Sequence, residues 1–225
     1  MTAPEYSLVN LPDNIAFEQA GRFGYLGTSY GALKNAGAGP GQVALIDGIT
    51  GTLGVAATVL GMAMGLSRIL GTGRDEELLR RVKALAPDRV EVMRLGEGSS
   101  GEWAKSLTGG DGADFVISAL GAKAPVDTML DSMKGVRRGG KVVNVGGVAD
   151  DLPIDVKWLM DEQIQLIGSN WFTAAQGQEM ADMVRTGTLD LSYLQHRKFP
   201  LAQVNEAISG LKDRDGGFSN YVVLP

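Results

Sequence analysis

Short apolar runs recur along the chain, and the stretches between them place apolar residues three or four positions apart. A short run rich in branched apolar residues is typical of a strand buried in a sheet, whereas the wider spacing marks one face of a helix. Strands are therefore predicted over QVALID at 42–47, SRILGT at 67–72, RVEVM at 89–93, ADFVISAL at 113–120, KVVNVG at 141–146 and IQLIGS at 164–169.

Helical spacing fills the intervals between these runs. The clearest case is DEELLRRVKALA at 75–86, whose leucines fall on one face. Strands that alternate with helices of about ten residues predict a parallel sheet covered by helices on both faces. The fold class is therefore α/β, a doubly wound six-stranded parallel sheet with short N- and C-terminal appendages. Further helices are predicted from 51 onward, around EWAKSL at 102–107, and over 125–133, 173–187 and 201–211.

One longer apolar run, from 55 to 70, contains glycines and is short for a membrane span, so it predicts a buried helix. The N-terminal MTAPEYSLVN lacks the charged-then-apolar pattern of a signal peptide. With a net charge of −5, the chain also lacks the basic footprint of a nucleic-acid-binding protein. The absence of cysteine fits a reducing compartment. We therefore expect a cytoplasmic protein that binds neither nucleic acid nor membrane.

Three glycines follow the first predicted strand at equal spacing: Gly48, Gly51 and Gly54. The first permits a tight turn, the second lets backbone approach a bound anion, and the third lets the next helix pack closely on the sheet. The N-terminus of that helix presents unpaired N–H groups and the positive end of its dipole to a pyrophosphate. A glycine-rich turn without a ligand is the alternative, but the position between strand and helix favours a dinucleotide site.

The end of the second strand bears on which nicotinamide dinucleotide is bound. NAD sites usually carry an acidic residue there, which accepts a hydrogen bond from the ribose 2′-hydroxyl. Here Gly73 occupies that place and Arg74 follows. An arginine at a helix start opposes the helix dipole, and a 2′-phosphate would supply the matching anion. The alternative is a solvated arginine paired with Asp75 or Glu76. We expect NADP(H) rather than NAD(H).

The chain resembles the medium-chain dehydrogenase/reductase superfamily, which contains the zinc alcohol dehydrogenases and the zinc-free quinone oxidoreductases. The resemblance covers nearly all 225 residues in the family's order. Its G-x-x-G-x-x-G turn is similar to the quinone oxidoreductase branch, and Gly73-Arg74 is similar to NADP-binding members. It implies a Rossmann fold and hydride transfer. The stretches that carry it, besides the glycine turn, are LVNLPDNIAFEQAG (8–21), GTSYGALKNAGAGPG (27–41), DFVISALG (114–121), GGKVVNVGG (139–147), LIGSNWF (166–172), PLAQVNEAISGL (200–211) and NYVVLP (220–225).

The resemblance also implies which parts of such an enzyme are missing. Family members usually carry an N-terminal GroES-like catalytic domain ahead of the segment that matches here from residue 1. A zinc ligand of the family would fall at Gly24, or at Tyr25 with a one-residue slip, and neither side chain binds zinc. Because His196 is the only histidine and there is no cysteine, the chain cannot assemble a tetrahedral zinc site. The expected organisation is a linking helical segment from the absent catalytic domain at 1–40, a dinucleotide-binding Rossmann domain at 41–190 and a C-terminal returning segment at 191–225.

Carried over residue by residue, the family's cofactor contacts define a set of expected binding positions. The resemblance leaves the catalytic residues unassigned, and no metal ligand is expected in the chain. The pyrophosphate is expected at Gly48, Gly51, Thr52, Leu53 and Gly54, and the adenosine ribose at Gly73 and Arg74. The middle of the cofactor is expected along Ser118, Ala119 and Leu120. The nicotinamide end is expected near Thr28, Gly146, Gly147, Val148, Ser169, Asn170 and Trp171.

Two other features invite catalytic interpretations. Tyr30 and Lys34 have the Y-x-x-x-K spacing of short-chain dehydrogenases, but they precede the glycine turn instead of following it. That order favours a packed tyrosine and a solvated lysine. His196 has no cofactor motif beside it, so an ordinary surface role is expected.

The sixth predicted strand indicates a partner. In the family, the matching strand is the sheet edge through which two subunits join. An exposed edge flanked by Trp158, Met160 and Trp171 would be prone to aggregation unless covered. We therefore expect a homodimer through residues around 158–172.

Three functions remain open. The favoured one is an NADP(H)-dependent oxidoreductase of the alcohol dehydrogenase/quinone reductase type, with a carbonyl, alcohol, quinone or enone as substrate. Its chemistry would need a separate or removed catalytic domain, so this chain alone would be inactive. The second is a non-catalytic NADP(H)-binding module that serves as a sensor or subunit. The third is a scaffold without cofactor, which the intact glycine turn disfavours.

Overall fold

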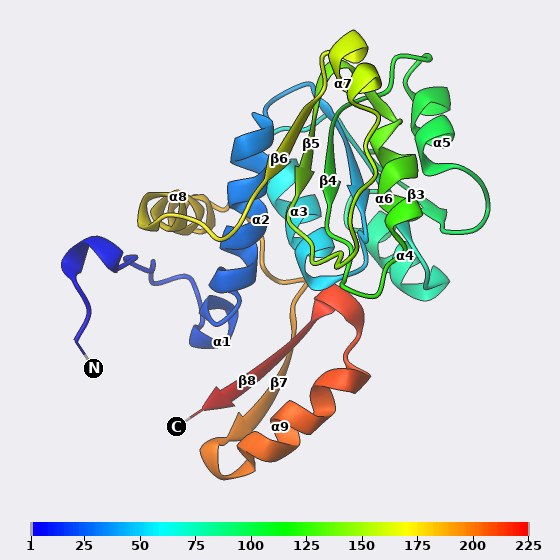
Figure 1. The fold of residues 1–225 in the computed structure, drawn as a ribbon. Helices are drawn as coiled ribbons and strands as arrows, with labels where there is room; N and C mark the ends of the chain where they lie inside the picture. Colours follow the sequence, from blue (N-terminus) through cyan, green and yellow to red (C-terminus); the bar gives the residue numbers. More distant parts are fainter. Residues whose placement is uncertain (1, 225) are drawn as a thin grey trace.

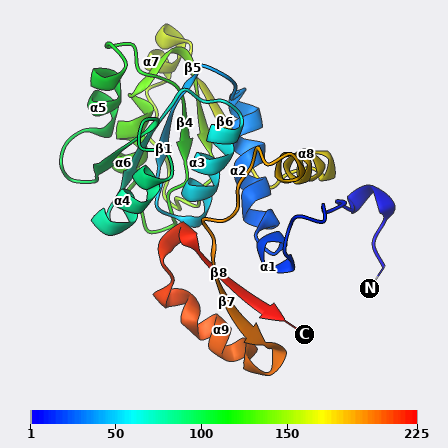
Figure 2. The same cartoon turned by 180° about the vertical axis from the view of Figure 1, so that it is seen from behind.

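Six parallel strands form the centre of the molecule, and helices cover both of their faces (Figures 1 and 2). The structure is a computed structural model that describes residues 2–224. Strand order is β3-β2-β1-β4-β5-β6, so the predicted doubly wound six-stranded sheet is confirmed. The strands are β1 (Val43–Asp47), β2 (Arg68–Gly73), β3 (Val90–Arg94), β4 (Ala113–Ser118), β5 (Val136–Asn144) and β6 (Gln165–Gly168).

Side chains that alternate along the strands face two different helix layers. In β1, Ala44 and Ile46 pack in one buried cluster, whereas Leu45 packs in the other. Both faces are buried, as expected of a parallel sheet between helices. The first layer contains α2 (Phe23–Ala36), α3 (Thr52–Ala63), α4 (Glu76–Ala84) and α8 (Ala174–Arg185). The second contains α5 (Ser100–Leu107), α6 (Val126–Met133) and α7 (Val156–Glu162).

The apolar run from 55 to 70 is not one helix, so that prediction was wrong. Helix α3 ends at Ala63, and the chain turns through Gly65, whose φ is 89°, before β2 begins at Arg68. A buried helix and a buried strand are both apolar on every side, so hydropathy alone does not separate them. The left-handed backbone at Gly65 provides the break.

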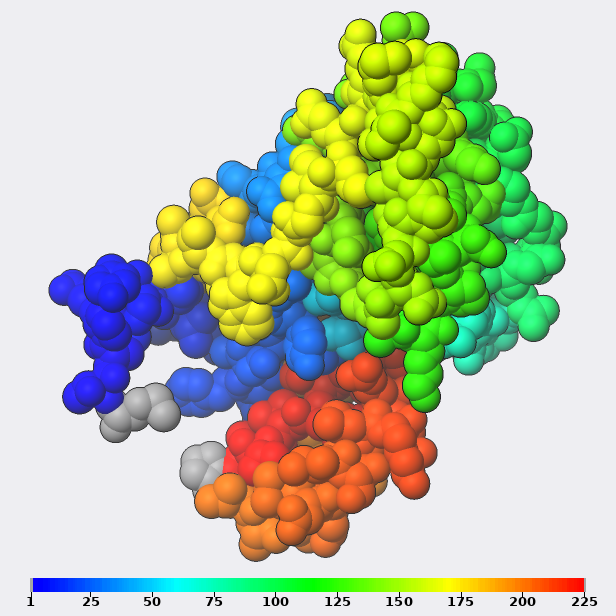
Figure 3. Space-filling model, in the orientation of Figure 1, coloured from blue at the N-terminus to red at the C-terminus, as the bar shows by residue number. Residues whose placement is uncertain are grey.

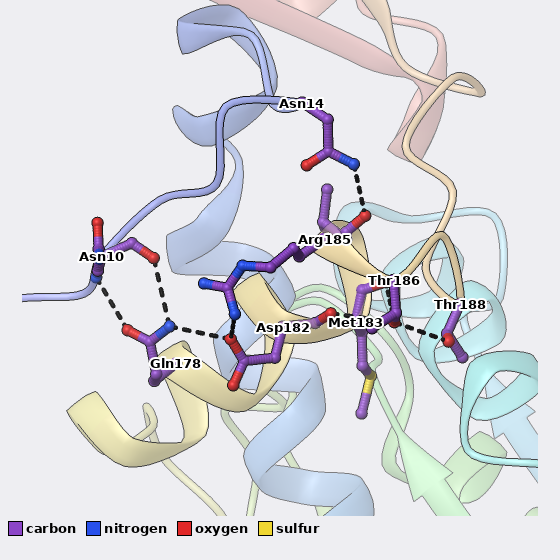
Figure 4. A network of polar contacts seen from close by, with 9 residues as sticks. Asn10, Asn14, Gln178, Asp182, Met183, Arg185, Thr186 and Thr188 are labelled. Atoms are coloured by element: carbon purple, nitrogen blue, oxygen red, sulfur yellow. Dashed lines mark hydrogen bonds and ion pairs between the residues drawn. The ribbon is translucent and has the colours of Figure 1, made fainter.

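The N-terminal segment reaches across the surface to α8 (Figure 4). The Asn10 backbone N–H donates to Gln178 Oε1 at 2.9 Å, and Gln178 Nε2 donates back to the Asn10 carbonyl oxygen at 3.3 Å. Asn14 Nδ2 donates to the Val184 carbonyl oxygen at 2.9 Å. Asn10 and Asn14 lie between the 3-10 turn η1 (Glu5–Ser7) and α1 (Phe17–Ala20), so these contacts attach the N-terminal segment to the helix layer.

The C-terminal segment forms a small lobe that was predicted only as a returning helix. Two parallel strands pair in a second sheet, and in the space-filling view their orange and red atoms lie beneath the main body (Figure 3). The lobe contains β7 (Gln195–Pro200), η2 (Leu201–Gln203), α9 (Val204–Gly210), η3 (Leu211–Asp213), η4 (Gly216–Phe218) and β8 (Ser219–Leu224).

This lobe is attached directly behind the glycine turn. The Gly217 backbone N–H donates to the Thr50 carbonyl oxygen at 2.9 Å. Arg22, only 6% exposed, donates through Nη2 to the carbonyl oxygens of Gly217 at 2.9 Å and Ser219 at 2.7 Å. The glycine turn is therefore bonded to the C-terminal lobe, and Arg22, from the N-terminal part of the chain, binds that lobe at the same place. Across residues 2–224, every helix is too short or too polar to cross a bilayer.

Candidate dinucleotide-binding site

A hollow of about 230 Å³ opens at the carboxyl ends of β1, β2 and β4. The crossover after β1 leads to β2 on one side, and the crossover after β3 returns to β4 on the other side of β1, so the hollow lies at the topological switch point of the sheet. Open α/β sheets bind ligands in this place. Six of the predicted cofactor residues line it: Gly48, Gly51, Gly73, Arg74, Ala119 and Leu120.

The glycine turn between β1 and α3 depends on bare backbone at two positions. Gly48 has a φ of 69°, and a Cβ there would lie 2.9 Å from the Ala119 carbonyl oxygen. A Cβ at Gly54 would lie 2.2 Å from the Gly48 carbonyl oxygen, which is far inside contact distance. The turn therefore folds back on the start of its own helix and also touches the loop after β4.

The start of α3 is open toward the hollow. Gly51 is the N-cap and provides no side-chain cap, and its own N–H donates to the Gly48 carbonyl oxygen at 2.9 Å. Within residues 2–224, the N–H groups of Thr52, Leu53 and Gly54 donate to no protein acceptor. Uncapped N–H groups and the positive end of a helix dipole favour an anion at this end.

The loops after β1, β4 and β5 hold one another in place. The Ala119 N–H donates to the Asp47 carbonyl oxygen at 3.1 Å. The Gly146 N–H donates to the Ser118 carbonyl oxygen and the Gly147 N–H to that of Leu120, each at 2.9 Å. These bonds join the predicted pyrophosphate turn to two of the other predicted segments.

The end of β2 leaves little room for a side chain at Gly73, and the next residue is a cation. Gly73 is buried, and a Cβ there would lie 3.0 Å from both the Thr50 and the Leu79 side chains. Arg74 is exposed and lines the hollow. The alternative pairing of Arg74 with a neighbouring acid is not observed. Asp75 instead accepts from the Leu78 N–H at 2.9 Å as the cap of α4, and Glu76 pairs with Arg94 at 3.1 Å.

The predicted nicotinamide-end residues gather elsewhere, mostly against α2. Thr28 Oγ1 donates to the Gly24 carbonyl oxygen at 2.8 Å, and Ser169 Oγ accepts from Asn35 Nδ2 at 3.0 Å. Trp171 has a φ of 63° and is 60% exposed. A Cβ at Gly31 would lie 2.6 Å from the Trp171 carbonyl oxygen, so the loop lies directly on the helix.

The remaining predicted positions occupy other surroundings. Val148 lines a different hollow, beside the end of β6. Asn170 is exposed, whereas Ser118 is fully buried in the sheet. The structure thus brings two of the predicted pyrophosphate positions, Gly48 and Gly51, into one hollow with both ribose positions and with Ala119 and Leu120. The other predicted positions do not line this hollow: Thr28, Thr52, Leu53, Gly54, Ser118, Gly146, Gly147, Val148, Ser169, Asn170 and Trp171. For every predicted position, inside the hollow or outside it, contact with the cofactor remains a prediction.

Several site residues were not predicted. Thr50, Leu95, Lys123, Pro125 and Thr128 also line the hollow. Thr50 lies inside the glycine turn, and Leu95 directly follows β3. Both could have been predicted from the sequence, because residues just after the carboxyl ends of parallel strands line such a site. Lys123 and Pro125 belong to the loop before α6, and their approach to Arg74 depends on how that loop folds.

A polar row lies under this edge of the sheet. Thr72, Asp47, Ser118 and Asn144 are register partners on four adjacent strands. Asp47 is fully buried; its Oδ1 accepts from Thr72 Oγ1 at 2.8 Å, while its Oδ2 has no partner within residues 2–224. Burial raises the pKa of the Asp47 carboxyl to about 7. The signal in the sequence is the acid that ends the apolar strand VALID.

Tyr30, Lys34 and His196, the residues that invited catalytic interpretations, form contacts within the protein. Tyr30 is buried, and its Oη donates to Glu179 Oε2 at 2.5 Å. Lys34 Nζ lies 3.1 Å from the same carboxylate. Burial and Glu179 raise the pKa of Tyr30. His196 Nδ1 lies 3.0 Å from Asn220 Nδ2 in the C-terminal lobe. No three His, Cys, Asp or Glu residues between 2 and 224 are grouped to hold a metal ion.

A doubly wound sheet with a glycine turn and an open helix start at its switch point defines a dinucleotide-binding α/β domain. Residues 52–186 match the family described as zinc-binding dehydrogenase. The chain belongs to this family and is similar to the cofactor-binding domain of the medium-chain dehydrogenase/reductase superfamily, as its resemblance implied.

Two curated relatives illustrate the match. The chain is 33% identical to an alcohol dehydrogenase of Geobacillus stearothermophilus over 80% of this chain and 51% of that protein. It is 28% identical to the human quinone oxidoreductase over 99% of this chain and 67% of that protein. The chain thus spans about half of the first relative's length and two thirds of the second's.

Two solved structures share the fold. One is a putative zinc-binding dehydrogenase from Sinorhizobium meliloti 1021 bound to NADP, with a TM-score of 0.79 and 19% identity, over 96% of this chain and 61% of that one. The other is an acetophenone reductase from Geotrichum candidum NBRC 4597 in complex with NAD, with a TM-score of 0.75 and 23% identity, over 96% and 58%. At these identities they support the fold alone.

Proposed function

We propose that the chain is the NADP(H)-binding portion of an oxidoreductase of the alcohol dehydrogenase/quinone reductase type. Hydride would pass between the nicotinamide and a carbonyl, alcohol, quinone or enone. The observation that carries the proposal is the switch-point hollow, whose lining combines the glycine turn with Arg74 and includes no carboxylate. The nicotinamide supplies the hydride chemistry, and the protein binds and orients the cofactor.

Each part of the chain has a role in this proposal. The free N–H groups at the start of α3 hold the pyrophosphate, and Arg74 holds a phosphate on the adenosine ribose. Residues 41–190 form the binding domain, 1–40 link it to a catalytic domain, and 191–225 return toward that domain. The catalytic domain lies outside residues 1–225, so the chain alone is inactive.

A non-catalytic NADP(H)-binding module is the second candidate. One observation favours it: the lining of the hollow contains no histidine, cysteine, aspartate or glutamate, the side chains that most often act as general acid, general base or nucleophile. Tight NADPH binding without turnover, in a protein supplied with every other part of its reading frame, would establish this alternative.

Replacing Arg74 by alanine is expected to weaken NADPH binding by roughly tenfold to a hundredfold and to leave NADH binding nearly unchanged. A charge-assisted hydrogen bond to phosphate is worth about 1.5–3 kcal/mol, and NADH has no phosphate at this position. Isothermal titration calorimetry of the wild type and of Arg74→Ala, each with NADPH and with NADH, measures these affinities. Arg138→Ala is the matched control, because that arginine is also exposed and unpaired within residues 2–224 but lies at the start of β5. Equal affinity of the wild type for NADPH and NADH would contradict the NADP assignment.

We also propose a homodimer through residues around 158–172. Strand β6 is a sheet edge, and Leu166, Met160 and Trp171 on or beside it are 40%, 67% and 60% exposed. Leu166→Lys is expected to convert a dimer into a monomer in analytical ultracentrifugation, because it places a charge on that edge. Ile208→Lys in α9 removes a comparably exposed apolar residue and is expected to leave the dimer intact. A wild-type protein that sediments as a monomer at micromolar concentration would refute the proposal.

A further inference from the structure

Two positively charged side chains line the switch-point hollow. Arg74 follows β2, and Lys123 lies in the loop between β4 and α6. Both side chains are exposed, and within residues 2–224 neither forms an ion pair or a side-chain hydrogen bond. No aspartate or glutamate lines the hollow. In a chain whose net charge is −5, this local excess of cations indicates an anionic ligand.

The neighbouring acids do not neutralise this pair. The Asp75 carboxylate accepts from the Leu78 N–H as the cap of α4, and Glu76 pairs with Arg94 at 3.1 Å. Arg94 also donates through Nε to the Arg74 carbonyl oxygen at 3.4 Å, so it supports the backbone of that residue instead of competing for its side chain. The charges of Arg74 and Lys123 therefore remain available in the hollow.

The order of the strands places the two cations on either side of the glycine turn. In the sheet, β1 lies between β2 and β4, and the glycine turn follows β1. A dinucleotide whose pyrophosphate lies on that turn therefore has cations beyond both neighbouring strand ends. Leu95 and Pro125 add apolar surface to the same hollow, as an adenine ring requires.

We propose that Lys123 is a second specificity-determining cation, which binds the 2′-phosphate of the adenosine ribose together with Arg74. This inference rests on the proposed NADP(H) function. The two residues differ in what they supply: the arginine fork donates hydrogen bonds to two phosphate oxygens in fixed geometry, and the lysine adds a mobile point charge from the opposite loop. The loop between β4 and α6 thereby takes part in choosing NADP(H) over NAD(H).

The test compares Lys123→Gln with the wild type in calorimetric titrations of NADPH, NADH, 2′-AMP and 5′-AMP. The expected result is an approximately tenfold loss of affinity for NADPH and 2′-AMP, with NADH and 5′-AMP unchanged. Lys123→Arg keeps the charge and is expected to retain most of the affinity. Lys212→Gln is the matched control, because Lys212 is exposed, unpaired within residues 2–224 and far along the chain in the C-terminal lobe.

The outcomes separate the two proposals. Suppose that the wild type prefers NADPH and that Arg74→Ala removes this preference. If Lys123→Gln then changes no affinity, or lowers the affinity for all four ligands equally, the assignment of Lys123 is wrong and the proposed function stands. If the wild type itself does not distinguish 2′-AMP from 5′-AMP, the NADP(H) function fails and the role of Lys123 fails with it.

Discussion

Replacing Gly54 by alanine is expected to destabilise the protein by about 3 kcal/mol or more and to remove its dinucleotide affinity. The added Cβ would lie 2.2 Å from the Gly48 carbonyl oxygen and 2.5 Å from Ile49 Cα. Both are backbone atoms, so the turn itself must move. Helix propensity predicts the opposite sign, since alanine in place of a helical glycine stabilises by about 1 kcal/mol.

A second glycine in α3 provides the control. A Cβ at Gly61 would meet the end of the buried Leu66 side chain at 2.6 Å, and a side-chain end shifts more readily than backbone. Gly61→Ala is therefore expected to change stability by much less than Gly54→Ala. Urea unfolding measures both variants, and NADPH titration follows for whichever variant folds. A Gly54→Ala protein as stable as the wild type would show that close approach does not hold this turn.

Hydropathy spacing predicted the main sheet well because buried parallel strands are short, apolar and separated by amphipathic helices. The glycine turn was predictable for a related reason: Gly48 and Gly54 are required by local backbone geometry, which one segment of sequence contains. The fold of the C-terminal lobe was not predictable in this way. Strand β7 is mostly polar in sequence, and β7 and β8 form a two-stranded sheet apart from the main one.

The binding hollow was only partly predictable, because it is formed by segments far apart in the chain. Gly73 and Arg74 follow a strand end and could be assigned by position. Lys123 joins them through the path of a loop that has no repeating pattern. The same holds for Asp47, whose partners in the sheet are set by strand order and register, not by neighbours in sequence.

Asp47 is a buried acid at the end of β1. Its carboxyl group is fully buried, and only one of its oxygens has a partner within residues 2–224, the Thr72 hydroxyl at 2.8 Å. The Asp131 carboxylate of α6, which accepts hydrogen bonds from Ser99 and Ser100, is a like charge that adds to the effect. Burial, and secondarily Asp131, raise the pKa of Asp47 from 3.8 to about 7 in the folded protein.

The direction of the pH effect follows from this pKa. A carboxyl group with a higher pKa in the folded state binds its proton more tightly there than in the unfolded chain. The unfolding free energy therefore falls as the pH rises from about 4 to about 7, and the loss is complete above that range. A rise of about three pKa units corresponds to a cost on the order of 4 kcal/mol at pH 8.

Asp47→Asn is expected to stabilise the protein at pH 8 by a few kcal/mol and to have little effect at pH 4. The amide has the shape of the carboxyl group and carries no charge, so it removes the cost of ionising a buried acid while keeping an acceptor for Thr72. Urea unfolding of both proteins at the two pH values measures the difference. Asp88→Asn, at an exposed acid with no side-chain hydrogen bond or ion pair within residues 2–224, corrects for the general effect of removing one negative charge. A loss of stability at pH 8, or a gain equal at both pH values, would show that Asp47 is ionised at no cost in the folded protein.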